Sequence, residues 1–228
     1  MRQLLLDWGA TGPPTLESFV IGRNQELAAM LRRIALREAA SLDQRFITLW
    51  GEAGAGKSHL LYALTGDGQA LYLSADQPIE NYAWSPEIAL YLLDDCDRLD
   101  ADQQIAAFAL YNQVRDSGGM LVAATGRPPA QLTLREDLRT RLAWGLVYQV
   151  HGLSDEEKID ALSKSADARG MVLSPGVLPY LLTHSRRDMQ SLSAILDALD
   201  RYSLETQRPI TMPLLRELLQ LSDAQTTS

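Results

Sequence analysis

Cysteine, lysine and long apolar runs are all scarce in this sequence. Its one cysteine, Cys96, cannot form an internal disulfide or build a multi-cysteine zinc site. The longest uninterrupted apolar run covers residues 88–93, far below the ~20 residues that a membrane-spanning helix needs. A secretion signal is not expected at the amino terminus, because Asp7 ends the first run of leucines. These absences predict a soluble, cytoplasmic protein with no membrane partner.

Positive charge is also limited, and almost all of it is arginine. The chain has 21 Lys and Arg against 29 Asp and Glu, a net charge of -8, and only three lysines. A surface that neutralises the phosphates of a DNA duplex would be basic, so this chain is a poor candidate for binding DNA without a partner. Arginine suits bidentate pairing and protein interfaces, so contact with DNA is expected only indirectly, through a partner.

The pattern of apolar residues alternates between strands and helices over the first two thirds of the chain. Strands are predicted at 46–50, 70–73, 88–94, 120–125 and 146–150, and helices at 26–40, 57–65, 102–116 and 137–143. This alternation predicts an α/β fold in which a five-stranded parallel sheet is covered by helices on both faces.

After residue 152 the pattern becomes purely helical. Residues 154–157 have the sequence of a capping box, which begins a helix that ends at Gly170. Further helices are predicted to begin at Ser174-Pro175, near Arg187 and at Pro213. We therefore expect a tail at 1–14, an α/β domain at 15–152 and a helical subdomain at 153–228.

Residues 51–58 match the phosphate-loop pattern G-x-x-x-x-G-K-[ST], with a predicted strand before it and a helix after it. In such a loop the backbone N–H groups and the helix dipole surround the phosphates of a nucleotide. Lys57 would supply a charge to the β- and γ-phosphates, and Ser58 would bind Mg²⁺. A glycine-rich turn that matches by chance is the alternative. The predicted contacts with the nucleotide are Gly51, Glu52, Ala53, Gly54, Ala55, Gly56, Lys57, Ser58 and His59.

Asp94 and Asp95 end an apolar strand, where two carboxylates cost desolvation unless a cation offsets their charge. Mg²⁺ and a polarised water would do so, with Asp94 nearer the metal and Asp95 nearer the water. An acidic turn is the alternative. ATPases that combine such a phosphate loop with rapid hydrolysis have a longer glutamate in the position of Asp95. We therefore expect slow intrinsic ATP hydrolysis.

Thr125 and several arginines are weaker candidates. Thr125 ends a strand and either directs its hydroxyl toward the γ-phosphate or caps the following loop. Arg135, Arg139 and Arg141 cluster before the last strand, where a solvated arginine surface is the simpler interpretation. Arg187 lies near a predicted helix start, where the helix dipole disfavours a cation, so an anion such as the nucleotide is expected nearby.

The order of these motifs resembles the DnaA-related AAA+ ATPases over roughly residues 15–221. Residues 15–24 are similar to the segment that encloses adenine in this family, which implies nucleotide contacts for Phe19 and Val20. The resemblance implies that Arg141 is an arginine finger acting on a neighbouring subunit and that Arg187 is the sensor arginine of the lid. It also implies bound ADP or ATP with Mg²⁺, and it allows a homo-oligomer.

Two departures from the initiator DnaA bear on function. The sequence ends after the helical subdomain, so we expect the initiator's DNA-binding domain to be missing. Residues 3–8 resemble a sliding-clamp-binding peptide, in which Gln3, Leu4, Leu6 and Trp8 would fill an apolar groove of the partner. A tail folded back onto its own domain is the alternative. The resemblance then implies a regulator that binds the sliding clamp (the DNA polymerase III beta subunit) and applies Arg141 to ATP bound by DnaA.

Two other functions fit the phosphate loop. A helicase loader would need a basic or aromatic surface for single-stranded DNA, which the charge balance disfavours. A freestanding P-loop kinase closes an arginine-rich lid between its strands, whereas these arginines precede the last strand and the helical subdomain is carboxyl-terminal. Cys96 is expected to be a small buried residue, and the three histidines do not suggest a metal site.

Overall fold

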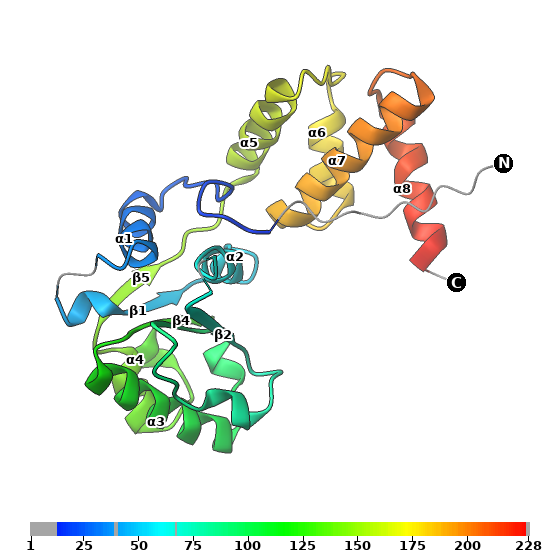
Figure 1. The fold of residues 1–228 in the computed structure, drawn as a ribbon. Coiled ribbons are helices and arrows are strands. Elements are labelled where there is room, and N and C mark those ends of the chain that lie inside the picture. Colours follow the sequence, from blue (N-terminus) through cyan, green and yellow to red (C-terminus); the bar gives the residue numbers. More distant parts are fainter. Residues whose placement is uncertain (1–12, 39–40, 67, 227–228) are drawn as a thin grey trace. The chain divides into compact units, whose positions relative to one another are not determined.

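A computed structural model describes residues 13–38, 41–66 and 68–226, which form two compact units (Figure 1). Pro14–Gly152 make one unit, and the chain from Leu153 onward belongs to the other. Within the described ranges, no helix combines the length and the apolar character that a membrane span requires. Residues 3–8, the predicted clamp-binding peptide, lie outside the described part of the chain.

The first unit is built on a five-stranded parallel sheet, as predicted, with the order β2-β3-β4-β1-β5. All four residues of β3 are buried, because helices cover both faces of the sheet and the strand needs no polar side. The strands are β1 (Phe46–Trp50), β2 (Ala70–Leu73), β3 (Leu90–Leu93), β4 (Met120–Thr125) and β5 (Leu146–Gln149).

Two pairs of helices cover the sheet from opposite sides (Figure 1). The helices α1 (Gln25–Ala35) and α2 (Lys57–Ala63) pack their leucines on one face. The helices α3 (Ala101–Ser117) and α4 (Glu136–Leu142) pack on the other. Apolar contact on both faces is what the alternating sequence pattern predicted.

The predicted extent of the first helix, to residue 40, is wrong. The helix α1 ends at Ala35, because Arg37 adopts a φ of 58°, a left-handed conformation that cannot continue a right-handed helix. The N–H of Leu36 still donates to the carbonyl of Arg32, so the last helical turn is closed just before the chain turns away.

In its described part the second unit consists of four helices and one isolated β-bridge between Leu173 and Ile210. Its capping box is confirmed, since Ser154 Oγ accepts from the N–H of Glu157 at 3.1 Å and Glu157 Oε2 accepts from the N–H of Ser154 at 2.7 Å. All four helices contribute leucines to a single core, which includes Leu162, Leu181 and Leu199. The helices are α5 (Asp155–Ala168), α6 (Val177–His184), α7 (Met189–Thr206) and α8 (Met212–Thr226).

The predicted environment of Arg187 needs a correction. The helix α7 begins at Met189, and Asp188 is its N-cap, whose side chain accepts from the N–H of Ser191 at 2.8 Å. Arg187 therefore precedes the helix, and its Nη1 lies 3.7 Å from Asp155 Oδ2. The carboxylate of Asp155, in the same unit, partly offsets its charge, so the position of Arg187 does not by itself require a bound anion.

Candidate nucleotide-binding site

The predicted phosphate loop lies between β1 and α2, and its glycines meet two separate requirements. Gly54 and Gly56 have φ values of 78° and 98°, which side-chain-bearing residues rarely adopt. A Cβ at Gly51 would lie 2.5 Å from the carbonyl oxygen of Val150, so this position has no room for a side chain. Lys57 Nζ donates to the carbonyls of Gly51 at 2.8 Å and Glu52 at 3.0 Å, which holds the ammonium group against the loop.

The strand order brings three of the predicted segments to one edge of the sheet. After β1 the chain enters α2 on one face, and after the adjacent β4 it enters α4 on the other, so the two connections part at this edge, which is where open α/β sheets commonly bind ligands. The N–H of Gly51 donates to the carbonyl of Thr125 at 3.3 Å. The N–H of Gly126 donates to Asp97 Oδ1 at 3.0 Å, which joins the acidic segment after β3 to the end of β4.

Asp94 is a buried carboxylate, with 3% of the residue exposed. Its Oδ2 accepts from the hydroxyl of Tyr72 at 2.7 Å, and its Oδ1 accepts from the N–H of Asp95 at 2.9 Å. Burial, followed by the hydrogen bond to Asp94, raises the pKa of Tyr72, so its hydroxyl stays protonated and donates. Both carboxylate oxygens keep lone pairs for a cation or for its bound water.

A cation at Asp94 would depend on the nucleotide for most of its ligands. Among the described residues, no three His, Cys, Asp or Glu side chains cluster as a metal site. Mg²⁺ commonly binds through one or two protein oxygens plus substrate phosphates and water. The oxygens of Ser58 and Asp94 fit that pattern, because they lie at the start of α2 and at the end of β3, on the carboxyl side of the sheet.

Asp95 is held differently from its neighbour. It has a φ of 47°, and its Oδ2 lies 3.2 Å from Arg98 Nη1, while Arg98 also contacts Asp76 at 3.3 Å. The side chain of Asp95 is 44% exposed, and an ion pair at such a site contributes little free energy. Asp95 is therefore able to exchange this partner for a water, its predicted role.

Thr125 is fully buried, and its hydroxyl donates to the carbonyl of Arg127 at 2.8 Å. The carbonyl of Leu49 lies farther from the same hydroxyl, at 3.4 Å. This geometry is the loop-capping alternative that the sequence left open. A contact between Thr125 and the γ-phosphate stays a prediction.

The predicted adenine-enclosing segment lies against the phosphate loop. A Cβ at Gly56 would come within 2.8 Å of the ring of Phe19, so that ring sits directly on the loop. His59 Nε2 lies 3.2 Å from Ser18 Oγ and 3.1 Å from the carbonyl of Thr15, which ties the segment to the first turn of α2. Phe19, His59 and the loop therefore form one surface, and Val20 lies beside it, partly buried.

Asn24 is a buried residue whose structural role no sequence motif indicates. Its Oδ1 accepts from the N–H of His151 at 2.8 Å, and its Nδ2 donates to the carbonyls of His151 at 2.9 Å and Ile21 at 3.1 Å. An asparagine just before a helix suggests an N-cap, but its side chain makes no cap hydrogen bond here. Asn24 instead fastens the segment before α1 to the chain that follows β5.

We expect Asn24→Ala to destabilise the first unit by about 1–3 kcal/mol, because it leaves the partly buried N–H and C=O of His151 without their partner. Thermal and urea denaturation would measure the loss. Asn81→Ala removes the same group from an exposed position and should change little. Equal stability of the two variants would show that water replaces Asn24 without cost.

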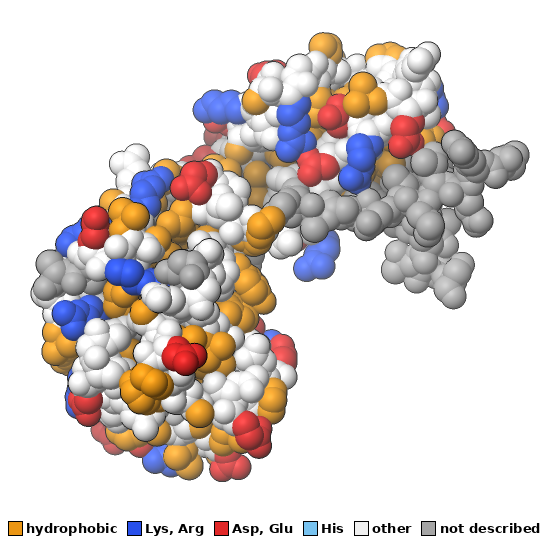
Figure 2. Space-filling view, viewed as in Figure 1, with side chains coloured by type: hydrophobic (Ala, Val, Ile, Leu, Met, Phe, Trp, Pro, Cys, Tyr) orange, Lys and Arg blue, Asp and Glu red, His pale blue; other side chains and the backbone are white. Residues whose placement is uncertain are grey.

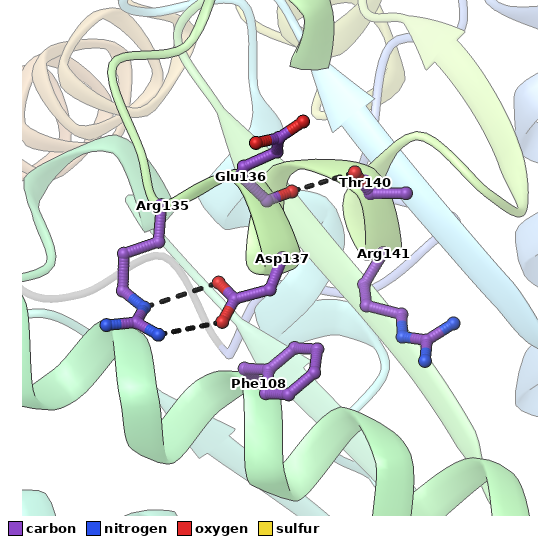
Figure 3. A pocket seen from close by; sticks show the side chains of 6 residues that line it. All are labelled: Phe108, Arg135, Glu136, Asp137, Thr140 and Arg141. Atoms are coloured by element: carbon purple, nitrogen blue, oxygen red, sulfur yellow. Dashed lines mark hydrogen bonds and ion pairs between the residues drawn. The ribbon is translucent and has the colours of Figure 1, made fainter.

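Arg141 lies at an open hollow of about 640 Å³ on the α3–α4 side (Figure 3). Its guanidinium carbon is 5.8 Å from the centre of the Phe108 ring, and among the described residues no carboxylate pairs with it. Arg135, by contrast, makes two hydrogen bonds to Asp137, at 2.8 and 3.3 Å, which lower the pKa of that carboxyl. The hollow is lined by Phe108, Arg135, Glu136, Asp137, Thr140 and Arg141.

Arg141 does not lie with the residues of its own phosphate loop. It precedes β5 and so belongs to the amino-terminal side of the strands, whereas the loop follows the carboxyl end of β1. In addition, α4 and α2 cover opposite faces of the sheet. Arg187 belongs to the helical unit, and Gln3, Leu4, Leu6 and Trp8, the residues predicted to bind the clamp, lie outside the described part of the chain.

Several known proteins share this fold at low sequence identity. Domain III of the Thermotoga maritima replication initiation protein DnaA is 20% identical, with a TM-score of 0.71 over 92% of this chain and 97% of that one. A DNA replication initiation factor is also 20% identical, with a TM-score of 0.67 over 84% of this chain. The match spans 65% of that factor, less than two thirds of its length. A variant of Thermotoga maritima RuvB is 15% identical, with a TM-score of 0.62 over 92% of this chain and 72% of that one.

The five-stranded parallel sheet, the phosphate loop after β1 and the carboxyl-terminal helices are the fold of an AAA+ ATPase. The predicted resemblance to the DnaA-related members of this class is confirmed. Residues 155–219 match the family model of the lid domain of Hda, so the helical unit is similar to that lid domain.

Proposed function

We propose that this chain is a regulator of replication initiation that binds adenine nucleotide and the sliding clamp and promotes hydrolysis of ATP bound by DnaA. In this role it acts as Hda does and inactivates the initiator. The observation that carries the proposal is the match of residues 155–219 to the Hda lid domain, on a chain that shares the fold of DnaA domain III over 92% of its length. The geometry of the first unit supports the individual steps.

The nucleotide would be ADP or ATP, with Mg²⁺. DnaA structures of similar fold are bound to AMPPCP, an analogue of ATP, which supports an adenine nucleotide in this chain. In the proposed site the loop N–H groups and Lys57 hold the phosphates, and Ser58 and Asp94 hold the cation. Phe19 and Val20 border the base, and Arg187 of the lid contacts the phosphates. When bound, Mg²⁺ neutralises charge on the phosphate oxygens.

Hydrolysis of this chain's own ATP would be slow. Asp95 is one methylene shorter than glutamate, and it shares its carboxylate with Arg98 at 3.2 Å. A water approaching the γ-phosphate would therefore meet a general base that is both short and partly engaged. Thr125 would contact the γ-phosphate only if its hydroxyl no longer donated to the carbonyl of Arg127.

The position of Arg141 supports action on a partner's nucleotide. Its guanidinium lies at an open hollow and away from this chain's own phosphate loop, where a second protein could dock against it. An arginine supplied in trans stabilises the charge that develops on the transferred phosphoryl group. In this proposal the nucleotide that receives Arg141 belongs to DnaA.

Contact with DNA would be indirect, through the clamp. The chain carries a net charge of -8. On the face drawn in Figure 2, acidic and basic side chains are interspersed over the described surface, and no broad area carries positive charge alone. Such a surface would gain little from the release of counterions that drives binding to duplex DNA.

A pull-down with the sliding clamp and DnaA, in ATP and in ADP, tests the proposal directly. We expect the clamp to be retained and DnaA to join the complex when the clamp is loaded on DNA. Turnover with small phosphate acceptors, without binding to either protein, would instead identify a kinase.

The tail supplies a separate test of clamp binding. We expect replacement of Gln3, Leu4 and Leu6 by alanine to abolish binding to the clamp, because these side chains would fill its apolar groove. The melting temperature should stay almost unchanged, since a tethering peptide does not belong to the core. A large loss of thermal stability would support the alternative, a tail packed on its own domain. Surface plasmon resonance and calorimetry would provide the two measurements.

A further inference from the structure

The carboxylate of Asp94 is held by a tyrosine that no sequence motif marks. Tyr72 lies in β2, and its hydroxyl donates to Asp94 Oδ2 at 2.7 Å. The backbone is fixed as well, since the N–H of Asp94 donates to the carbonyl of Leu73 at 2.8 Å. The edge strand β2 therefore sets both the backbone and one oxygen of the residue that follows β3.

The ring of Tyr72 is itself supported from the phosphate-loop helix. Tyr62 lies in α2, and its ring stacks on that of Tyr72 with centroids 4.1 Å apart and planes 18° apart. Aromatic stacking of this kind stabilises the position of the ring beyond what burial alone does. A continuous line of contacts thus runs from α2 through Tyr62 and Tyr72 to the carboxylate of Asp94.

The chemical character of the partner matters. Tyr72 and the N–H of Asp95 are neutral donors, so they orient the carboxylate without cancelling its charge. Asp95 differs, because Arg98 already offsets its charge. The terminal torsion of an aspartate is broad and roughly two-fold, so a single hydrogen bond would leave the carboxylate free to turn about it. Two donors, one on each oxygen, fix its plane.

We propose that Tyr72 is a positioning residue of the Mg²⁺–nucleotide site, which holds the carboxylate of Asp94 in the orientation that receives the cation or its bound water. This inference rests on the proposed nucleotide site. The hydroxyl of Tyr72 donates to Asp94, so its removal should affect only the part of nucleotide affinity that depends on Mg²⁺. Phosphate contacts made by Lys57 and the loop do not need it.

The test compares Tyr72→Phe with the wild type in ADP binding, with and without Mg²⁺. The variant keeps the ring and its stacking and loses only the hydroxyl. We expect the affinity in EDTA to stay within about twofold, and the enhancement by Mg²⁺ to fall roughly threefold to tenfold, the worth of one positioned hydrogen bond. Mn²⁺ in place of Mg²⁺ gives a second readout, because electron paramagnetic resonance measures its binding to the ADP complex directly.

Tyr148→Phe is the matched control. Its hydroxyl donates to Glu26 at 3.4 Å from β5, the opposite edge strand, so the same chemical change is made away from Asp94. We expect this variant to keep the full enhancement by Mg²⁺. An equal loss in both variants would overturn the inference, because it would reflect a general effect on the sheet.

Removal of the Tyr72 hydroxyl also leaves a buried oxygen with one donor fewer, so the fold of the variant must be checked by circular dichroism. If Tyr72→Phe does not fold, fluorine NMR of the wild type with 3-fluorotyrosine at position 72 gives the answer. Mg²⁺ added to the ADP complex should then shift that resonance, and an unchanged resonance would overturn the inference.

Two negative results have different meanings. Equal enhancement by Mg²⁺ in the wild type and Tyr72→Phe would overturn the role of Tyr72 and leave the proposed nucleotide site intact. A wild type that binds no ADP, or binds it without any effect of Mg²⁺, would overturn the proposed site and this inference with it.

Discussion

Arg141→Ala is expected to abolish the acceleration of DnaA-bound ATP hydrolysis while leaving the fold, the ADP affinity and the clamp binding of this protein unchanged. An arginine finger contributes on the order of 10³–10⁵ in rate at the site that it enters. Single-turnover hydrolysis by ATP-bound DnaA, on clamp-loaded DNA with each variant added, would measure the effect.

The geometry explains why the loss should be confined to the partner. The guanidinium carbon of Arg141 lies 5.8 Å from the centre of the Phe108 ring, and Arg141 pairs with no carboxylate among the described residues. Its removal therefore breaks no ion pair in the described part of the chain. It lies on the amino-terminal side of the sheet, away from this chain's own phosphate loop. Truncation to alanine should therefore leave nucleotide binding by this protein intact.

Two other arginines make the test specific. Arg139→Ala removes the same charge from the same helix but lies outside the hollow around Arg141, so it should keep most of the stimulation. Arg187→Ala should weaken nucleotide binding first, because the lid would close over this protein's own site. If Arg141→Ala stimulated DnaA as well as the wild type does, the finger assignment would be wrong even with clamp binding established.

Local sequence patterns were sufficient for most of the fold. The fully buried β3 is an unbroken apolar run in the sequence, which predicts a buried strand. The capping box at Ser154 predicts where α5 begins. The phosphate loop was equally clear, because two of its glycines have positive φ and a third has no room for a Cβ. In each case the physical requirement falls on consecutive residues.

The residues that sequence reasoning missed all depend on contacts between distant segments. Asn24 bonds to a residue 127 positions away, and Tyr72 to one 22 positions away. Nothing near Tyr72 in the sequence distinguishes it from an ordinary edge-strand tyrosine. Its partner is set by the pairing of β2 with β3, which becomes known only with the strand order.

Helix ends were missed for a different reason. The first helix was predicted to run to residue 40, yet the positive φ of Arg37 ends α1 at Ala35. The predicted start of α7 near Arg187 lay too early, because Asp188 caps the helix and Met189 is its first helical residue. Periodicity reports which face of a helix is buried, and it does not report where the backbone leaves the helical conformation.

Lys57→Ala is expected to weaken binding of ADP and ATP by roughly tenfold to a hundredfold, since a charge-assisted contact of this kind contributes about 1.5–3 kcal/mol. The loop carbonyls of Gly51 and Glu52 already hold the ammonium at 2.8 and 3.0 Å, so the side chain is placed before a nucleotide arrives. Titration calorimetry would measure the change for each nucleotide.

The chain contains only three lysines, and one of the other two supplies a matched control. Lys164 lies in α5, is 74% exposed and pairs with Asp160 at 2.7 Å, so Lys164→Ala removes the same charge from a surface ion pair of little energetic weight. Its ADP affinity should match that of the wild type. If Lys57→Ala also matched the wild type, the loop would not be holding phosphates, and the nucleotide site would have to lie elsewhere despite its sequence pattern.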